Sequence, residues 1–136
     1  MKKSLKDDEI ELRVRYGETD QMGVVYHGNY AQYFEIGRVE WLRKAGLSYK
    51  QMEADGVMLP VISLSVKFKK SARYDDLIKV KTRLVKMPSA TIEFEYEIVN
   101  EAGEILTIGN TSLVFIDIHR NRPTRCPKYL LDKLQN

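Results

Sequence analysis

Hydrophobic and polar residues alternate in several stretches of the chain, which is the period-2 pattern of strands with one buried face. The first stretch runs from Ile10 to Tyr16. Three more have their inward positions at Ile62, Leu64, Val66 and Phe68, at Ile78, Val80, Thr82 and Leu84, and at Ile92, Phe94, Tyr96 and Ile98. A longer strand is expected from Glu104 to about His119, with Gly109 as a candidate bulge.

Between residues 29 and 46 the pattern is helical instead. Bulky residues recur at helical spacing, at Tyr30, Phe34, Trp41 and Ala45. Asn29 is a suitable N-cap and Gly46 a natural end. Gly37 lies in the middle, where glycine costs about 1 kcal/mol relative to alanine. Either a close approach of the helix to a sheet requires this glycine, or it is a weak point in the helix.

A second, short helix is predicted after Ser48, because Ser48-Tyr49-Lys50-Gln51 has the pattern of a capping box. Gly56 should end this helix, and Pro60 prevents its continuation. A last helical turn or two is expected within residues 127–134.

The predicted order is a strand, a long helix, a short helix and four strands joined largely by hairpins. Such an order favours an α+β fold in which a mostly antiparallel sheet carries one central helix. The sequence shows no linker or repeat, so residues 1–136 are interpreted as a single domain.

Two neighbouring predicted strands carry opposite charges on their outward positions. These are Lys79, Lys81 and Arg83 in one strand and Glu93, Glu95 and Glu97 in the next. If the strands pair antiparallel, opposite charges meet across the exposed face, each pair contributing about 0.2–1 kcal/mol. This face is therefore interpreted as solvated and not as a binding site.

The overall composition narrows the class of protein. The 136 residues are 43% hydrophobic and 30% charged, which is typical of a folded globular domain. The net charge is only +3, with basic and acidic residues interspersed, so no nucleic-acid partner is expected. Cys126 is the only cysteine, which favours a cytoplasmic location. No signal peptide or membrane insertion is expected, because no apolar run is long enough.

The densest cluster of chemically unusual residues lies between the first strand and the long helix. In this loop Asp20 precedes His27 by seven residues. Backbone N–H groups at a helix start are unpaired and carry a partial positive charge. The loop would thus bring a carboxylate and an imidazole near donors that polarise a carbonyl, although an Asp in a loop is more often a turn residue.

The same loop resembles the active-site signature of the YbgC and 4-hydroxybenzoyl-CoA thioesterase branch of the hot-dog superfamily. The pattern is Tyr-x-x-Thr-Asp-x-x-Gly-x-Val-Tyr-His-x-x-Tyr, and it is matched by Tyr16, Thr19, Asp20, Gly23, Val25, Tyr26, His27 and Tyr30. The resemblance continues through Tyr33-Phe34-Glu35-x-x-Arg38-x-Glu40 and residues 70–76. It implies a hot-dog fold, in which a curved antiparallel sheet wraps around the central helix.

The resemblance also implies roles for individual residues of an acyl-CoA thioesterase. Asp20 would attack the thioester carbonyl or activate a water, while backbone N–H groups near His27 and Gly28 would stabilise the oxyanion. The His27 side chain would orient the carboxylate or protonate the leaving thiolate. Tyr16 is a further site candidate, with packing as its alternative role. No metal or cofactor is implied.

The family resemblance further implies a homo-oligomer, a dimer at minimum and often a tetramer, with sites at subunit interfaces. Basic residues would hold the phosphates of coenzyme A, and acyl carrier protein is a second possible carrier. The candidates are Lys69, Lys70, Arg73, His119, Arg120, Arg122 and Arg125. Another branch of the superfamily places its catalytic acid on the central helix, where this chain has Glu35. Because Asp20 is present, Glu35 is expected to orient neighbours or to form a surface or interface pair.

Two rival functions remain open at this point. A dehydratase or hydratase acting on acyl thioesters would share the fold, because fold does not fix chemistry. A non-catalytic acyl-thioester-binding protein would retain affinity without turnover. Water addition to an enoyl thioester would identify the first rival, and binding without thiol release the second.

Overall fold

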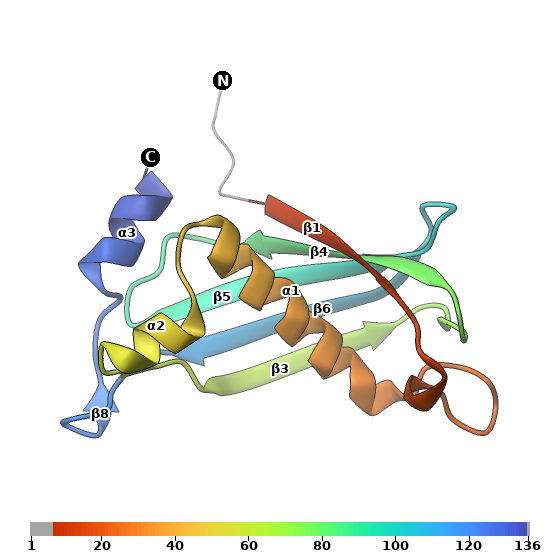
Figure 1. The fold of residues 1–136 in the computed structure, drawn as a ribbon, viewed down its shortest axis with the longest axis horizontal. Coiled ribbons are helices and arrows are strands. Elements are labelled where there is room, and N and C mark those ends of the chain that lie inside the picture. Colours follow the sequence, from red (N-terminus) through yellow and green to blue (C-terminus); the bar gives the residue numbers. More distant parts are fainter. Residues whose placement is uncertain (1–6, 136) are drawn as a thin grey trace.

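The computed structural model describes residues 7–135, and within them a five-stranded antiparallel sheet carries the long helix α1 on one face (Figure 1). The strand order is β1-β4-β5-β6-β3. The bounds are β1 (Asp7–Arg13), β3 (Val61–Phe68), β4 (Leu77–Leu84), β5 (Thr91–Val99), β6 (Ile105–Val114) and α1 (Tyr30–Lys44). The predicted antiparallel sheet with one central helix is therefore confirmed.

Shorter elements surround this frame. A second, three-stranded sheet in the order β2-β7-β8 lies at one end of the molecule (Figure 1). The elements are β2 (Val57–Met58), β7 (Ile116–Asp117), β8 (Arg122–Pro123), the helices α2 (Tyr49–Ala54) and α3 (Lys128–Gln135), and the 3-10 turns η1 (Tyr16–Glu18) and η2 (His27–Asn29). Helices α2 and α3 confirm the two short helices predicted. No helix within residues 7–135 is long and apolar enough to cross a bilayer.

The core lies between α1 and the inner face of the sheet. The side chains with the largest buried volume are Trp41, Tyr33, Tyr96, Phe34, Phe94 and Phe115. A Cβ at Gly37 would lie 2.5 Å from Thr82 Oγ1 and 2.9 Å from Val80 Cγ1. The glycine is therefore required by the close approach of the helix to β4, and the first of the two interpretations holds.

Several local predictions were wrong. The first strand ends at Arg13, and Tyr16 begins a 3-10 turn. This turn forms because the backbone N–H and the hydroxyl of Thr19 both donate hydrogen bonds to the Tyr16 carbonyl. Gly109 is not a bulge; it pairs in register, and its missing Cβ leaves room for the Phe34 ring. The last long strand ends at Val114, after which β7 leaves the main sheet.

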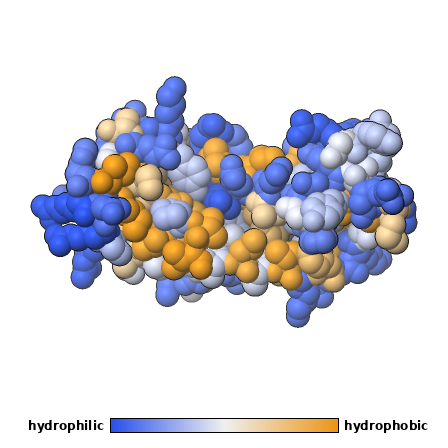
Figure 2. Space-filling model, turned by 90° about the horizontal axis from the view of Figure 1, so that it is seen from below, coloured by the Kyte–Doolittle hydropathy of each residue, from blue (hydrophilic) through white to orange (hydrophobic). Residues whose placement is uncertain are grey.

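The strand β3 departs most from its pattern, because every residue except Val66 is exposed. Ile62 and Leu64 are 58% and 46% exposed, although they alternate as the inward face of a strand. The reason is geometric: β3 is an edge strand that pairs only with β6, and α1, which runs diagonally across the sheet, packs mainly on β1 and β4 (Figure 1). Figure 2, seen from this edge, shows hydrophobic residues extending along the molecule.

The outer face of the sheet carries the predicted charges. Lys81 lies opposite Glu97 and Arg83 opposite Glu95, and the second of these pairs forms an ion pair. Lys79 lies opposite Val99 and pairs instead with Glu9 on β1. The side-chain register thus places two of the three expected pairs directly opposite each other.

Candidate functional site

Residues 18–26 fold into a small hairpin that projects beside the start of α1. The Tyr26 N–H donates to the Glu18 carbonyl at 2.9 Å, and the Asp20 N–H donates to the Val24 carbonyl at 2.8 Å. The returning arm also bonds to the segment after β3, where the Val25 N–H donates to the Ala72 carbonyl at 2.8 Å. The hairpin is therefore attached at its base and along one side.

Asp20 lies next to the tip of this hairpin and is exposed. Its Oδ1 accepts the N–H of Met22 at 2.8 Å and, more weakly, that of Val24 at 3.4 Å. Asp20 is thus a turn residue, as a loop Asp often is. These contacts fix the carboxylate through one oxygen, and within residues 7–135 the other oxygen has no hydrogen-bond donor, so it is free to accept a proton or attack.

The amides after the hairpin are arranged as donors. His27 and Gly28 open the turn η2, which leads directly into α1. Neither backbone N–H has an acceptor within residues 7–135, because the first N–H groups of a helical turn have no partner one turn earlier. With the N-terminal end of the helix dipole behind them, these N–H groups favour negative charge.

A cavity of about 280 Å³ is lined by both Asp20 and His27, whereas Gly28 lies next to it in the chain and does not line it. Its lining consists of Asp20, Val24, Val25, His27, Tyr30, Phe68, Lys69, Lys70 and Ser71. Phe68, at the end of β3, has its ring 5.3 Å from that of Tyr30 and 6.5 Å from the His27 imidazole, both edge to face. The cavity therefore combines a carboxylate, an imidazole and an aromatic wall with two ammonium groups.

The predicted phosphate-binding residues fall into two groups in space. Lys69 and Lys70 line the cavity. The backbone of Arg73 forms an isolated antiparallel β-bridge with that of Val24 in the hairpin. Lys70 is paired with Glu104, whereas Lys69 has no carboxylate partner within residues 7–135. The other group, His119, Arg120, Arg122 and Arg125, surrounds β8 at the opposite end of the sheet (Figure 1). Within one chain the structure does not bring it to the cavity.

Tyr16 also lies outside the lining of the cavity. Its ring is 77% exposed and packs edge to face on Tyr74, with 5.6 Å between the centroids. Conversely, sequence reasoning gave no site role to Glu18 or Asn29 and considered Tyr33 only as a residue that lines or supports the acyl pocket, although all three hold the hairpin against α1. Asn29 does not cap the helix with its side chain as predicted; its Nδ2 donates to the Glu18 carbonyl at 2.8 Å. The signals in the sequence were the acidic residue two positions before Asp20 and the place of Tyr33 in the family pattern.

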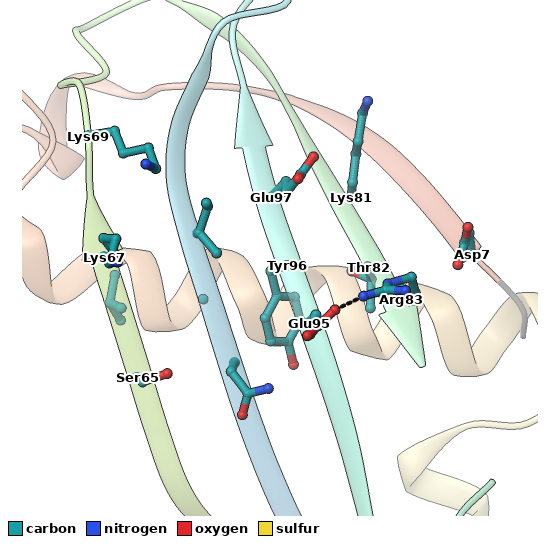
Figure 3. A pocket seen from close by; sticks show the side chains of 14 residues that line it. Asp7, Ser65, Lys67, Lys69, Lys81, Thr82, Arg83, Glu95, Tyr96 and Glu97 are labelled. Atoms are coloured by element: carbon teal, nitrogen blue, oxygen red, sulfur yellow. Dashed lines mark hydrogen bonds and ion pairs between the residues drawn. The ribbon is translucent and has the colours of Figure 1, made fainter. Parts of the chain in front are cut away.

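A larger hollow, of about 650 Å³, lies on the outer face of the sheet (Figure 3). Figure 3 shows charged side chains around it, among them Lys67, Lys81 and Glu97. Lys69 lines this hollow as well as the smaller cavity. Asp20 and His27 do not line it, so the smaller cavity is the candidate active site.

Comparison with known sequences identifies the family of this chain. Residues 14–134 match the thioesterase-like superfamily. The putative acyl-CoA thioesterase YneP of Bacillus subtilis is 34% identical over 122 residues, which cover 90% of this chain and 88% of YneP. The acyl-CoA thioester hydrolase YbgC of Escherichia coli is 31% identical over 120 residues, which cover 88% of this chain and 90% of YbgC.

A solved structure gives the same result for the fold. The DHNA-CoA thioesterase from Staphylococcus aureus superposes with a TM-score of 0.86 and 43% sequence identity, covering 93% of this chain and 85% of that one. The predicted hot-dog fold and the predicted class of enzyme are thereby confirmed. The chain belongs to the thioesterase-like superfamily and is a thioesterase of the hot-dog fold.

Proposed function

We propose that this protein hydrolyses an acyl-CoA thioester to a free carboxylic acid and coenzyme A, with Asp20 as the nucleophile or the general base. The observation that supports this proposal is the cavity that Asp20 and His27 line together with Lys69 and Lys70. A carboxylate for the attack, donors for the oxyanion and cations for the carrier phosphates are the groups that this reaction needs.

In the general-base route, Asp20 takes a proton from a water whose oxygen attacks the thioester carbonyl. The carbonyl oxygen becomes an oxyanion, which accepts the backbone N–H groups of His27 and Gly28; such donors are worth about 10²–10³-fold in rate. The carbon–sulfur bond then breaks, and the leaving thiolate takes a proton from the imidazolium form of His27, which the proton taken up by Asp20 restores; such a transfer is worth about 10²–10⁴-fold. In the nucleophilic route, the Asp20 carboxylate attacks the carbonyl carbon and expels the thiolate to form an anhydride, and water then hydrolyses the anhydride to the free acid and the Asp20 carboxylate.

For the acyl group, we propose that aromatic acyl-CoAs are the first class to test. The wall formed by Tyr30, Phe68 and His27 offers ring faces and edges to a flat apolar group. In addition, the Staphylococcus aureus protein that is 43% identical is named as a DHNA-CoA thioesterase. Acyl carrier protein is the alternative carrier.

The proposal is tested by thiol release from a panel of short, medium, long and aromatic acyl groups, each presented on coenzyme A and on acyl carrier protein. Release that follows enzyme concentration supports hydrolysis and identifies the acyl group. Binding without release from any member would favour the acyl-thioester-binding protein. Water addition to an enoyl thioester would favour the hydratase.

A second copy of the chain is proposed to cover the exposed edge at β3, giving a dimer or a tetramer. The edge presents unpaired backbone groups along eight residues together with exposed Ile62, Leu64 and Phe68. An edge of this kind is a template for pairing with another strand, and monomers rarely leave such an apolar band uncovered. Phe68 lies both on this edge and in the cavity, so the second copy would border the active site.

We also propose a cytoplasmic location. The single Cys126 is buried as a free thiol, and burial raises its pKa to about 12. A single thiol that stays protonated in the core cannot form a disulfide within the chain, and disulfides are the usual feature of proteins from oxidising compartments.

The two groups of basic residues make different contributions to substrate binding. Charge reversal by Lys69→Glu is expected to raise the KM for acyl-CoA about tenfold with little change in kcat, because it replaces attraction to a phosphate by repulsion beside the cavity. Arg122→Glu is the matched change at the far end of the sheet. The measurement is the KM and kcat of both variants for acyl-CoA by steady-state kinetics. An unchanged KM in Arg122→Glu would exclude that cluster, and a raised one would mean that a second copy brings it to the cavity.

Glu35 is expected to contribute far less to turnover than Asp20. It is exposed on α1 and does not line the cavity, whereas Asp20 does. Glu35→Gln keeps the shape of the side chain and should therefore retain most of the wild-type kcat. Measured beside Asp20→Asn on the same substrate, an equal loss in both variants would overturn the assignment of Asp20.

A further inference from the structure

Glu18 is bonded to more parts of the site than any residue assigned a catalytic role. Its Oε1 accepts the backbone N–H of Arg15 at 2.8 Å and the hydroxyl of Tyr33 at 2.9 Å. Its Oε2 accepts Nε of Arg15 at 3.1 Å. The side chain is only 13% exposed. One carboxylate therefore connects the start of η1 to the first turn of α1.

The charge of Glu18 is stabilised by these donors. Burial raises the pKa of this carboxyl, but hydrogen bonds from the Arg15 backbone, Tyr33 and the Arg15 side chain together outweigh burial and hold the pKa below its usual value. Glu18 is thus ionised at neutral pH. A hydrogen bond to an ionised acceptor is stronger than one between neutral groups, so the bond from Tyr33 is a firm connection.

The backbone of Glu18 makes a second connection. Its carbonyl accepts the Tyr26 N–H at 2.9 Å and the Asn29 side chain at 2.8 Å. Asp20 follows Glu18 by two residues on one arm of the hairpin, and His27 follows Tyr26 on the other. Glu18 therefore lies at the point where the carboxylate arm and the amide arm of the site are joined.

We propose that Glu18, held by Tyr33, is a positioning residue that fixes the Asp20 carboxylate relative to the N–H donors of His27 and Gly28. The inference rests on the proposed thioester hydrolysis. Hydrolysis needs the attacking oxygen and the oxyanion donors on one substrate carbonyl at the same time. A shift of about 1 Å between them is enough to cost on the order of 10²-fold in rate.

Tyr33→Phe is the sharpest variant, because it removes only the hydroxyl that donates to Glu18. The ring, which is 1% exposed, keeps its packing in the core. Tyr96→Phe is the matched control: its hydroxyl is also buried and bonded, to Thr111 Oγ1 at 2.6 Å, but it lies in the middle of the sheet. Both changes remove one buried hydroxyl that is bonded to a charged side chain, Glu18 for Tyr33 and Arg38 for Tyr96, so their effects on the free energy of unfolding should be similar.

The experiment combines steady-state kinetics with hydrogen–deuterium exchange of residues 17–29. We expect Tyr33→Phe to lower kcat about tenfold while KM stays within about twofold of wild type, since orientation is lost and binding is not. Tyr96→Phe should leave kcat unchanged. In an Asp20→Asn background, Tyr33→Phe should cause no further loss, because a positioning residue acts through the group that it positions.

Three outcomes would overturn the proposal. The first is an unchanged kcat in Tyr33→Phe, and the second is a fall in kcat in Tyr96→Phe as large as that in Tyr33→Phe. The third is a fall in kcat on adding Tyr33→Phe to Asp20→Asn that is as large as the fall in the wild-type background. Exchange separates this failure from failure of the proposed function. If the wild type hydrolyses no thioester, faster exchange of residues 17–29 in Tyr33→Phe than in Tyr96→Phe still supports the attachment of the hairpin, and equal exchange refutes it.

Discussion

Asp20→Asn is expected to lower kcat for thioester hydrolysis by about 10²–10⁴-fold, the usual contribution of a general base. Asparagine keeps the side-chain oxygen that accepts the Met22 N–H at 2.8 Å, so the hairpin should retain its shape. What is lost is the negative charge and the second carboxylate oxygen, and an amide neither accepts the proton of an attacking water nor acts as a nucleophile. The measurement is thiol release at saturating substrate.

The structure offers a matched control for this variant. Asp117 holds a turn in the same way, since its Oδ1 accepts the N–H of His119 at 2.9 Å, but it lies on β7, far from the cavity. Asp117→Asn should therefore leave kcat unchanged. A kcat in Asp20→Asn close to that of Asp117→Asn would mean that Asp20 serves only as a turn residue and that another group carries out the attack.

Leu64→Glu is expected to convert the proposed oligomer to monomers, raising its dissociation constant by at least about 10²-fold. The reason is that an unpaired carboxylate buried in an apolar interface costs about 3 kcal/mol or more. Leu64 is 46% exposed in the single chain, so the fold itself should tolerate the change. Sedimentation or light scattering over a range of concentrations measures the shift, and activity should fall with it, because Phe68 belongs to both the edge and the cavity.

Ile36→Glu is the control for the β3 edge. Ile36 is 42% exposed and places the same charge on the outer side of α1 instead of on the edge strand. It should leave the assembly intact. If Leu64→Glu has the mass of the wild type at all concentrations, the second copy does not cover β3, and the apolar band in Figure 2 has a different occupant.

The interior of the fold could be predicted from the order of the amino acids. Alternation at β4 and β5 predicted their buried faces correctly, and the helical spacing predicted α1. These patterns were reliable because the helix and the two strands bury their apolar faces in the same core. The loop with Asp20 and His27 was also recognisable. Its residues lie within one short segment between a strand and a helix, so their proximity needs no knowledge of the tertiary structure.

Features that depend on residues outside that segment could be assigned only once the packing of the elements was known. Period-2 alternation marks a face that will be covered, but it does not say by what; for β3 the covering element is not α1, and the pattern was wrongly assigned to the core. Likewise, the sequence does not distinguish Lys69 from Arg122 as a candidate phosphate-binding residue. Only the fold places Lys69 at the cavity and Arg122 at the opposite end of the sheet.

The attachment of the site was equally hidden from the sequence. Glu18 and Tyr33 are fifteen residues apart. Their hydrogen bond exists because the chain reverses in the hairpin and then enters α1 with Tyr33 facing back toward it. Hydrophobic pattern and motif spacing describe neighbours along a strand or helix. Polar contacts between elements depend instead on how those elements pack, and this is why the residues that position Asp20 became visible only in the folded chain.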